Sequence, residues 1–171
     1  IVVNPAYRLG AWGFGWFKDI APSLESDSNL GLRDQIAALQ WVQDNIAAFA
    51  GDPHRVTVFG ESAGGFSVAT LMATPAAKSL FQRAIVQSGA ADFVLAPEEA
   101  AKVAEVLVHG LAGHDSVADR LRHVAARDFI RAQNGSLRQV VKRGLRDSTP
   151  QFGMVYMPVV DGDLLPQSPI D

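Results

Sequence analysis

The segment Val56–Met72 reads VTVFGESAGGFSVATLM. With Arg55 it opens on a β-branched run, RVTVFG, which predicts a strand over 55–60. A helical pattern starts at Ser62 and continues to about Met72. Between the two, residues 60–64 (GESAG) fit G-x-S-x-G. A serine on a tight strand-to-helix turn, with strained backbone angles and an exposed hydroxyl, is typical of the nucleophile of a serine hydrolase.

The spacing of this pattern has a physical reason. We expect a Cβ at Gly60 or Gly64 to collide with neighbouring backbone, which explains a glycine at both positions. The N–H of Ala63 lies at the start of the helix, where it can point at a developing oxyanion. Ser62 is therefore the candidate nucleophile, and Ala63 is the candidate oxyanion-hole donor.

The composition fits one globular domain. The chain has 171 residues, of which 48% are hydrophobic and 19% are charged. A net charge of −3 gives no general attraction to nucleic acid or anionic membranes, and no apolar run is long enough to span a bilayer. Cysteine is absent, which excludes disulfides, thiolate zinc sites and a cysteine nucleophile but leaves the cellular compartment open.

Strands and helices alternate through the first half of the chain. The apolar runs predict three parallel strands, near residues 1–4, 55–60 and 83–88. Between the first two, apolar positions three and four residues apart predict a helix from Leu30 to about Phe49, with Asn29 as its N-cap. This alternation is typical of an α/β fold with crossover helices.

The second half changes character after Gly89. The expected elements are a helix from Pro97 to Gly110, a helix capped by Ser116, a turn at Asn134-Gly135, a basic helix over 136–147, and extended chain over 154–166 with a turn at Asp161-Gly162. We expect a single partial domain over 1–171, with a core over 1–93, a helical excursion over about 96–148 and the extended segment 154–166.

Several motifs resemble the carboxylesterase type B family, which includes carboxylesterases, cholinesterases and bacterial para-nitrobenzyl esterases. The resemblance covers most of the chain and is weakest from about Leu95 to Phe152. It departs from the family pattern at Ala6, where the family usually has Asn, and at Ala50, where it usually has Gly. The stretches that carry it are YRLGAWGF (7–14), NLGLRDQIAALQWVQDNIAAFAGDPHRVTVFGESAGG (29–65), FQRAIVQSG (81–89) and PVVDGDLLP (158–166).

The resemblance implies a partial α/β-hydrolase fold and a serine ester hydrolase. Ser62 would be acylated by a small-molecule ester, and no cofactor is implied. The family's Gly-rich loop, which supplies the other oxyanion N–H groups, is not in this chain. A non-catalytic, cholinesterase-like interaction domain is the alternative, and the retained Ser62 argues against it. A peptidase or thioesterase on the same fold is a further alternative, against which the long match over 29–65 argues.

The partners of Ser62 are the open question. In this fold the chain order is serine, acid, histidine, so His54 is excluded. The resemblance places a Glu acid and a His base after PVVDGDLLP, and hence beyond Asp171. The chain opens directly on the strand-like IVV and ends on PQSPID without a closing element, so both ends are expected to be cuts within a longer protein. The chain alone is expected to be inactive. The alternative pairs Asp92 as the acid with one of the histidines that follow Ser62, which are His109, His114 and His123.

Other residues carry weaker expectations. Glu61 is interpreted either as a carboxylate that supports the site or as a hydrogen-bond partner of buried backbone. The resemblance makes Ser88 a buried serine near the triad acid, with a structural role preferred. Phe93 fits an acyl pocket or the core equally well. Arg8 and Asp34 match positions that form an internal ion pair in the family.

The remaining charged residues predict neither a nucleic-acid site nor a metal site. A basic stretch lacks interleaved aromatic residues in an acidic chain and is interpreted as a solvated helix face. Its members are Arg131, Arg138, Lys142, Arg143 and Arg146. The histidines show no H-E-x-x-H or comparable ligand spacing. The expected ligand is thus an ester alone.

Overall fold

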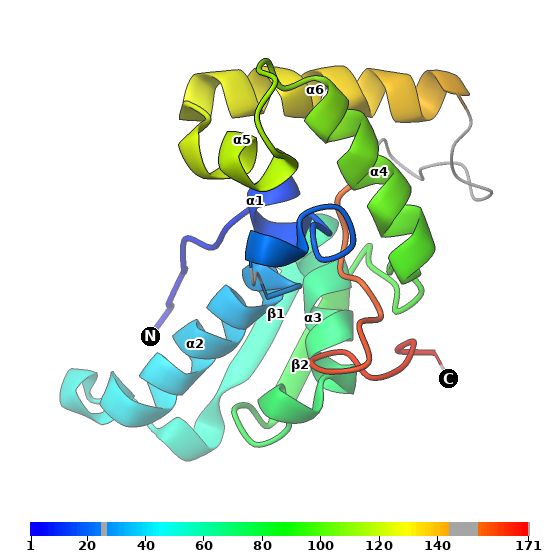
Figure 1. Ribbon diagram of the computed structural model, residues 1–171. Coiled ribbons are helices and arrows are strands. Elements are labelled where there is room, and N and C mark those ends of the chain that lie inside the picture. The colour runs from blue at the N-terminus through cyan, green and yellow to red at the C-terminus, as the bar shows by residue number, and fades with distance from the viewer. Residues whose placement is uncertain (25–26, 144–153, 171) are drawn as a thin grey trace.

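A parallel βαβ unit forms the centre of the lower half of the molecule (Figure 1). The computed structural model describes residues 1–24, 27–143 and 154–170. Strand β1 (Thr57–Glu61) leads into helix α3 (Ala63–Ala73), which crosses over to strand β2 (Arg83–Gln87). The two strands pair in parallel with Phe59 opposite Ile85. The predicted strands near 55–60 and 83–88, and the crossover between them, are confirmed.

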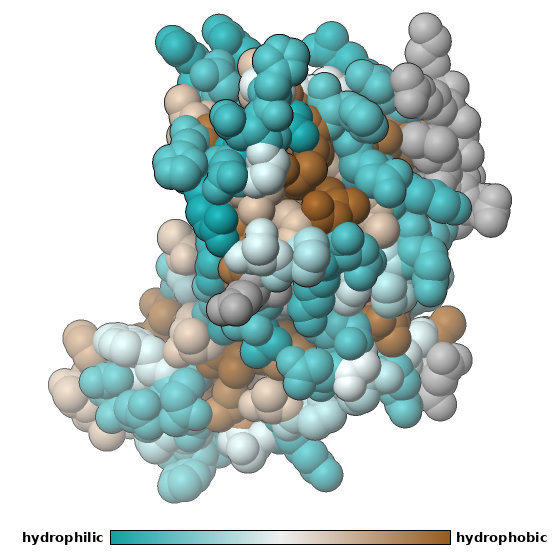
Figure 2. All heavy atoms as spheres, viewed as in Figure 1, coloured by the Kyte–Doolittle hydropathy of each residue, from teal (hydrophilic) through white to brown (hydrophobic). Residues whose placement is uncertain are grey.

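The helices divide into two groups. Figure 1 shows α4, α5 and α6 together at one end, above α1, with α2, α3 and the strands at the other end. The bounds are α1 Gly10–Phe14, α2 Leu30–Asn45, α4 Pro97–His109, α5 Val117–His123 and α6 Ala126–Arg143, with 3-10 turns at Pro22–Leu24, Ile46–Phe49, Pro53–Arg55 and Pro75–Ala77. Ser116 accepts the N–H of Asp119, as expected of an N-cap. Apolar side chains also reach the surface in both halves (Figure 2).

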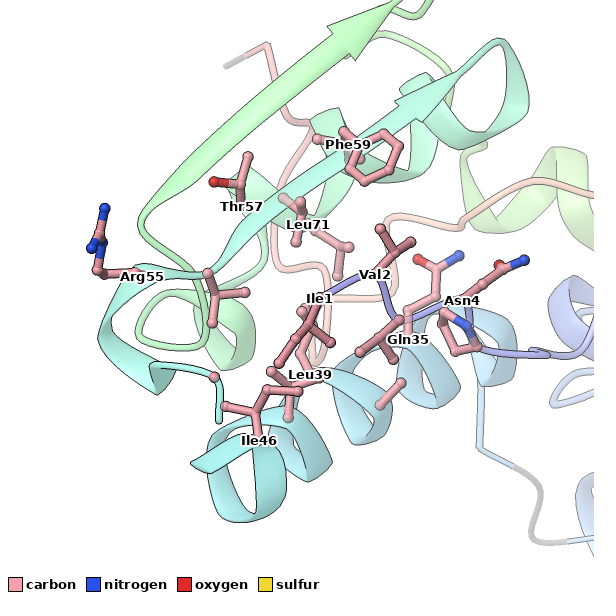
Figure 3. Close-up of a pocket in the computed structure, with 18 of the residues that line it drawn as sticks. Ile1, Val2, Asn4, Gln35, Leu39, Ile46, Arg55, Thr57, Phe59 and Leu71 are labelled. Carbon is pink, nitrogen blue, oxygen red and sulfur yellow. The ribbon is translucent and has the colours of Figure 1, made fainter. Parts of the chain in front are cut away.

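The prediction of a third strand over residues 1–4 is wrong. This segment belongs to no strand, and Ile1 and Val2 are 74% and 78% exposed. Among the described residues, no backbone hydrogen bond joins it to β1. A β-branched run forms a strand only when a neighbouring backbone lies within hydrogen-bonding reach, and a cavity separates this run from β1 (Figure 3).

The predicted turn at Asn134-Gly135 is also wrong, because α6 runs through it without a break. On α6, Phe129, Ala132 and Ser136 are buried at spacings of three and four residues, so the buried face continues past the turn signal. Packing of this face outweighs the local preference of Asn-Gly. Of the basic stretch, Arg131 and Arg138 are exposed, while Arg146 and the side chains of Lys142 and Arg143 lie outside the described residues.

Asn29 precedes α2, but its side chain does not cap the helix. It takes the left-handed conformation (φ 54°) and makes two 2.8 Å hydrogen bonds with the backbone of Val159, one to the carbonyl and one from the N–H. Val159 in turn forms a parallel bridge with Leu95. The predicted turn at Asp161-Gly162 is confirmed, with Gly162 at φ 73°. The segment 154–166 is thereby attached to the start of α2.

Candidate active site

Ser62 lies on the turn between β1 and α3, with φ 51° and ψ −116°. A non-glycine residue in this region is strained, and such strain persists only where the surroundings hold it. Two backbone hydrogen bonds of 2.9 Å do so here, from Ser62 N–H to the Gln87 carbonyl and from Phe66 N–H to the Ser62 carbonyl. The serine residue is exposed. The expected strained turn with an outward serine is confirmed.

The glycines around this turn have different reasons to be glycine. A Cβ at Gly60 would overlap the backbone of Gly64, as expected. The expectation for Gly64 itself is wrong, because a Cβ there would meet no atom of the described residues within 4 Å. Sequence reasoning missed the close approach of α3 to β2, where a Cβ at Gly65 would lie 2.6 Å from the Gln87 carbonyl oxygen and one at Gly89 would overlap Gly65. The sequence signal for this close approach was the glycine at the end of GESAGG and the glycine at the end of AIVQSG.

Ala63 is the first residue of α3, so its N–H has no intrahelical carbonyl to bind. The positive end of the helix dipole lies at the same place, and together they favour a developing negative charge beside Ser62. The geometry is therefore that of one oxyanion donor adjacent to an exposed hydroxyl.

Two polar residues next to the turn are exposed. Glu61 ends β1, and Ser88 follows β2 in a left-handed conformation with φ 50°. The buried serine that the resemblance implies at position 88 is thus on the surface of this chain. Within the described part of the chain, neither side chain makes a hydrogen bond.

The histidines that follow Ser62 lie on α4, on α5 and in the loop between them. His109 ends α4, His114 lies in the following loop, and His123 ends α5, with its Nδ1 2.9 Å from the Asp119 carbonyl oxygen. All three are exposed, as is Asp92. No hydrogen bond among the described residues joins any of these side chains to Ser62.

A cavity of about 220 Å³ lies against the oxyanion donor. Its walls include Ala63, Phe66, Phe93 and Tyr156. The rings of Phe66 and Phe93 stack with centroids 4.1 Å apart. Phe93 is also 8% exposed and belongs to a buried cluster with Trp16 and Leu95, so it is part of the core as well as a cavity wall.

The larger cavity, of about 680 Å³, lies on the side of β1 away from β2. Figure 3 shows Ile1 and Val2 between β1 and α2, with Gln35 and Leu39 of α2 on the opposite wall from Phe59. Gly64 and Ser67 line it as well, whereas Ser62 lines neither cavity and adjoins the smaller one through Ala63. The size of a cavity therefore does not mark the site in this chain.

Arg8 and Asp34 form the ion pair expected from the sequence. Arg8 Nη2 lies 2.6 Å from Asp34 Oδ1, and Arg8 Nε and N–H donate to Asp34 Oδ2 at 2.8 and 2.9 Å. These hydrogen bonds from Arg8 lower the pKa of Asp34 below its ordinary value. The pair fixes the chain just before Leu9 and Gly10, which line the cavity beside Ala63.

Two further properties bear on ligands. Within residues 1–24, 27–143 and 154–170, the His, Asp and Glu side chains form no group of three that could hold a metal ion. None of the helices in the described part of the chain combines the length and apolar character that crossing a bilayer requires.

Comparison with known proteins gives one consistent result. A family model described as "Carboxylesterase family" matches residues 1–171. The chain is 43% identical over 169 residues to the para-nitrobenzyl esterase of Bacillus subtilis (strain 168), covering 99% of this chain and 32% of that protein. It is 40% identical over 172 residues to liver carboxylesterase 1 of Mus musculus, covering 99% and 30%.

The fold agrees with solved structures. A structure of a "PNB esterase" superposes with a TM-score of 0.79 at 44% identity, covering 95% of this chain and 33% of that one. This chain thus spans about a third of the length of these relatives. Because the family model and the full-length matches agree over the whole chain, this protein belongs to the carboxylesterase family, whose α/β-hydrolase fold it partly contains.

Proposed function

We propose that the protein carrying this chain hydrolyses carboxylic esters of small molecules, with Ser62 as its nucleophile. The observation that carries the proposal is the strained, outward turn of Ser62 between a parallel strand and a helix. The relatives named para-nitrobenzyl esterase and liver carboxylesterase support esters as the substrate class.

In the proposed reaction, Ser62 Oγ attacks the ester carbonyl carbon and gives its proton to a base. The carbonyl oxygen becomes an oxyanion, which the Ala63 N–H stabilises. The tetrahedral intermediate collapses, the C–O bond to the alcohol breaks, and the base returns the proton to the leaving alkoxide. Water then attacks the acyl-serine in the same way and releases the acid, so Ser62 is regenerated.

The general base and its acid are proposed to come from the part of the protein beyond this chain. The chain covers 32% of the para-nitrobenzyl esterase, and its own three histidines after Ser62 are exposed and make no hydrogen bond to that residue. Glu61 and Ser88, which flank the turn, are proposed to support the site without reacting. Activity of the isolated chain would instead favour the alternative, in which Asp92 acts with one of the three histidines.

The cavity beside Ala63 is the proposed site of the acyl group. Its walls are mostly aromatic and apolar, and its volume of about 220 Å³ is below the range of about 300–1,000 Å³ that drug-sized ligands occupy. A short acyl chain suits this volume. The acyl carbon must lie against both Ser62 Oγ and the Ala63 N–H, so the chain attached to it can enter the cavity beside Ala63.

Covalent labelling tests the role of Ser62. We expect a fluorophosphonate probe to label the full-length protein with one adduct on the peptide that contains Ser62. The Ser62→Ala variant should lose both the adduct and p-nitrophenyl ester hydrolysis, while Ser79→Ala, a change at an exposed serine outside both cavities, should keep them. Labelling that persists in Ser62→Ala would contradict the proposal.

A further inference from the structure

Helix α6 contacts two different walls of the cavity beside Ala63, although it lines none of that cavity itself. Its contacts are made by polar side chains, Gln133 toward α1 and Ser136 toward Tyr156. Ser136 is 1% exposed, and a serine buried on a helix face needs a hydrogen-bond partner to offset its desolvation. Both of its partners are in place.

The direction of the hydrogen bonds at Ser136 follows from the donors available. Ser136 Oγ lies 2.8 Å from the Gln133 carbonyl, which only accepts, so the Ser136 hydroxyl donates there. Ser136 Oγ must then accept from the Tyr156 hydroxyl, 2.5 Å away. Burial raises the pKa of Tyr156 to about 12, so this phenol stays protonated and can donate. Tyr156 is thus held against α6 from its hydroxyl end while it also lines the cavity.

Gln133 contacts α1, which contributes another part of the wall. Its Oε1 accepts the N–H of Ala11 at 2.8 Å. The same Gln133 side-chain amide lies so close to Gly10 (φ +57°) that a Cβ at Gly10 would overlap it. Gly10 and Phe14, at the two ends of α1, line the cavity. The preceding turn of α6 adds an apolar contact, since Phe129 stacks on Trp12 with centroids 5.0 Å apart.

We propose that Gln133 and Ser136 are positioning residues, which set the separation of the two cavity walls and thereby the length of acyl chain that the enzyme prefers. This inference rests on the proposed ester hydrolysis at Ser62. Neither residue lines the cavity, so each acts through a hydrogen bond. Ser136 binds the lining residue Tyr156, and Gln133 binds Ala11, which follows the lining residue Gly10. Releasing a wall lets it move outward and admits a longer chain.

The test compares acyl chain lengths in the full-length enzyme. The measured quantity is the ratio of kcat/KM for p-nitrophenyl hexanoate to that for p-nitrophenyl acetate. The concentration of folded enzyme cancels from this ratio, so a loss of stability alone leaves it unchanged. Ser136→Ala and Tyr156→Phe break the same hydrogen bond, and we expect each to raise the ratio by about threefold to tenfold, as expected for one buried hydrogen bond.

The double variant Ser136→Ala/Tyr156→Phe should raise the ratio no further than the larger single effect, because the two changes remove one interaction. Ser116→Ala is the matched control, since it removes a helix-capping serine on α5 and should leave the ratio unchanged. Tyr156→Phe keeps the ring and its packing, so it supplies a result even if Ser136→Ala does not fold.

A second pair of variants tests the other wall. Gln133→Leu removes the acceptor for the Ala11 N–H and should raise the ratio, whereas Gln133→Glu keeps an acceptor oxygen and should restore the original value. Ratios that stay constant in Ser136→Ala, Tyr156→Phe and Gln133→Leu, with Ser62 still labelled by the fluorophosphonate, would overturn this inference alone. Absence of labelling at Ser62 would instead overturn the proposed function.

Discussion

The two flanks of β1 differ in how completely they surround the serine turn. Toward β2, the Ser62 N–H binds the Gln87 carbonyl at 2.9 Å, and Gly65 packs directly against the backbone of Gly89. On the other flank lies the cavity of about 680 Å³, and Gly64 faces open space. The strained conformation of Ser62 is therefore held from the β2 flank, where neighbouring backbone leaves it no alternative.

The contacts that position Ser62 are thus distinct from the groups that the proposed catalysis requires. The β2 flank contributes contacts that position Ser62 and Ala63, and these are contained in the chain. Catalysis needs more oxyanion donors and a base, and the open flank of β1 contributes neither among the described residues. A correctly formed turn is thus expected without a complete catalytic site.

The largest expected effect is the loss of activity in the 171-residue chain made alone. We expect p-nitrophenyl acetate hydrolysis at background, because lack of a triad member lowers kcat by about 10⁴-fold or more and lack of one oxyanion donor by about a further 10²-fold. The assay compares the chain with its Ser62→Ala variant. Saturable turnover that disappears in the variant would show a base within the chain and direct attention to Asp92 with His109, His114 or His123.

Two adjacent glycines allow the flanks to be compared directly. Gly65→Ala places a Cβ 2.6 Å from the Gln87 carbonyl oxygen and should lower the free energy of unfolding by about 3 kcal/mol. Gly64→Ala places a Cβ against none of the described residues and should raise the free energy of unfolding by up to about 1 kcal/mol through better helix propensity. Urea unfolding of the two variants measures both. Equal losses at the two positions would mean that the flanks do not differ.

The strand-to-helix turn at Ser62 was predictable because its requirements are local. A strand, a strained residue and a helix follow one another within Thr57–Ala73, and glycine spacing reports the tight turn at Ser62. The close approach of Gly65 and Gly89 was not predictable in the same way, since it depends on how α3 packs on β2.

The wrong predictions share a dependence on distant partners. Residues 1–4 have strand-like composition, but strand formation needs a neighbouring backbone that this segment does not meet. Asn29 has the position of a helix cap, but its side chain hydrogen-bonds the backbone of Val159, which is distant in sequence. At Asn134-Gly135 the buried face of α6 decides the conformation against the turn preference.

A smaller effect is expected where the segment 154–166 is attached to the start of α2. Burial alone would raise the pKa of Asp161, but hydrogen bonds from Ser28, Asn29 and two backbone N–H groups hold it below its ordinary value. We expect Asp161→Asn to lower the free energy of unfolding by about 2 kcal/mol. Asp163→Asn, which breaks only the exposed pair with Arg33, should cost less than about 1 kcal/mol. Equal losses in the two variants by urea unfolding would contradict this role.

The smallest expected effect concerns the Arg8–Asp34 pair, which holds the N-terminal segment beside the open flank. The folded pKa of Asp34 lies below its ordinary 3.8, mainly because of the side-chain hydrogen bond from Arg8, so the pair stabilises the fold above the unfolded pKa. That contribution is lost as the pH falls through 3.8 toward the lower folded pKa.

At pH 7, Asp34→Asn should lower the free energy of unfolding by about 1 kcal/mol, since Arg8 is half exposed. This deficit should vanish in acid. Asp44→Asn is the matched control, since Asp44 lies on the same helix and makes no ion pair with any described residue, and it should cost less at pH 7. A deficit for Asp34→Asn that stays constant from pH 7 into acid would show that the ion pair does not stabilise this flank.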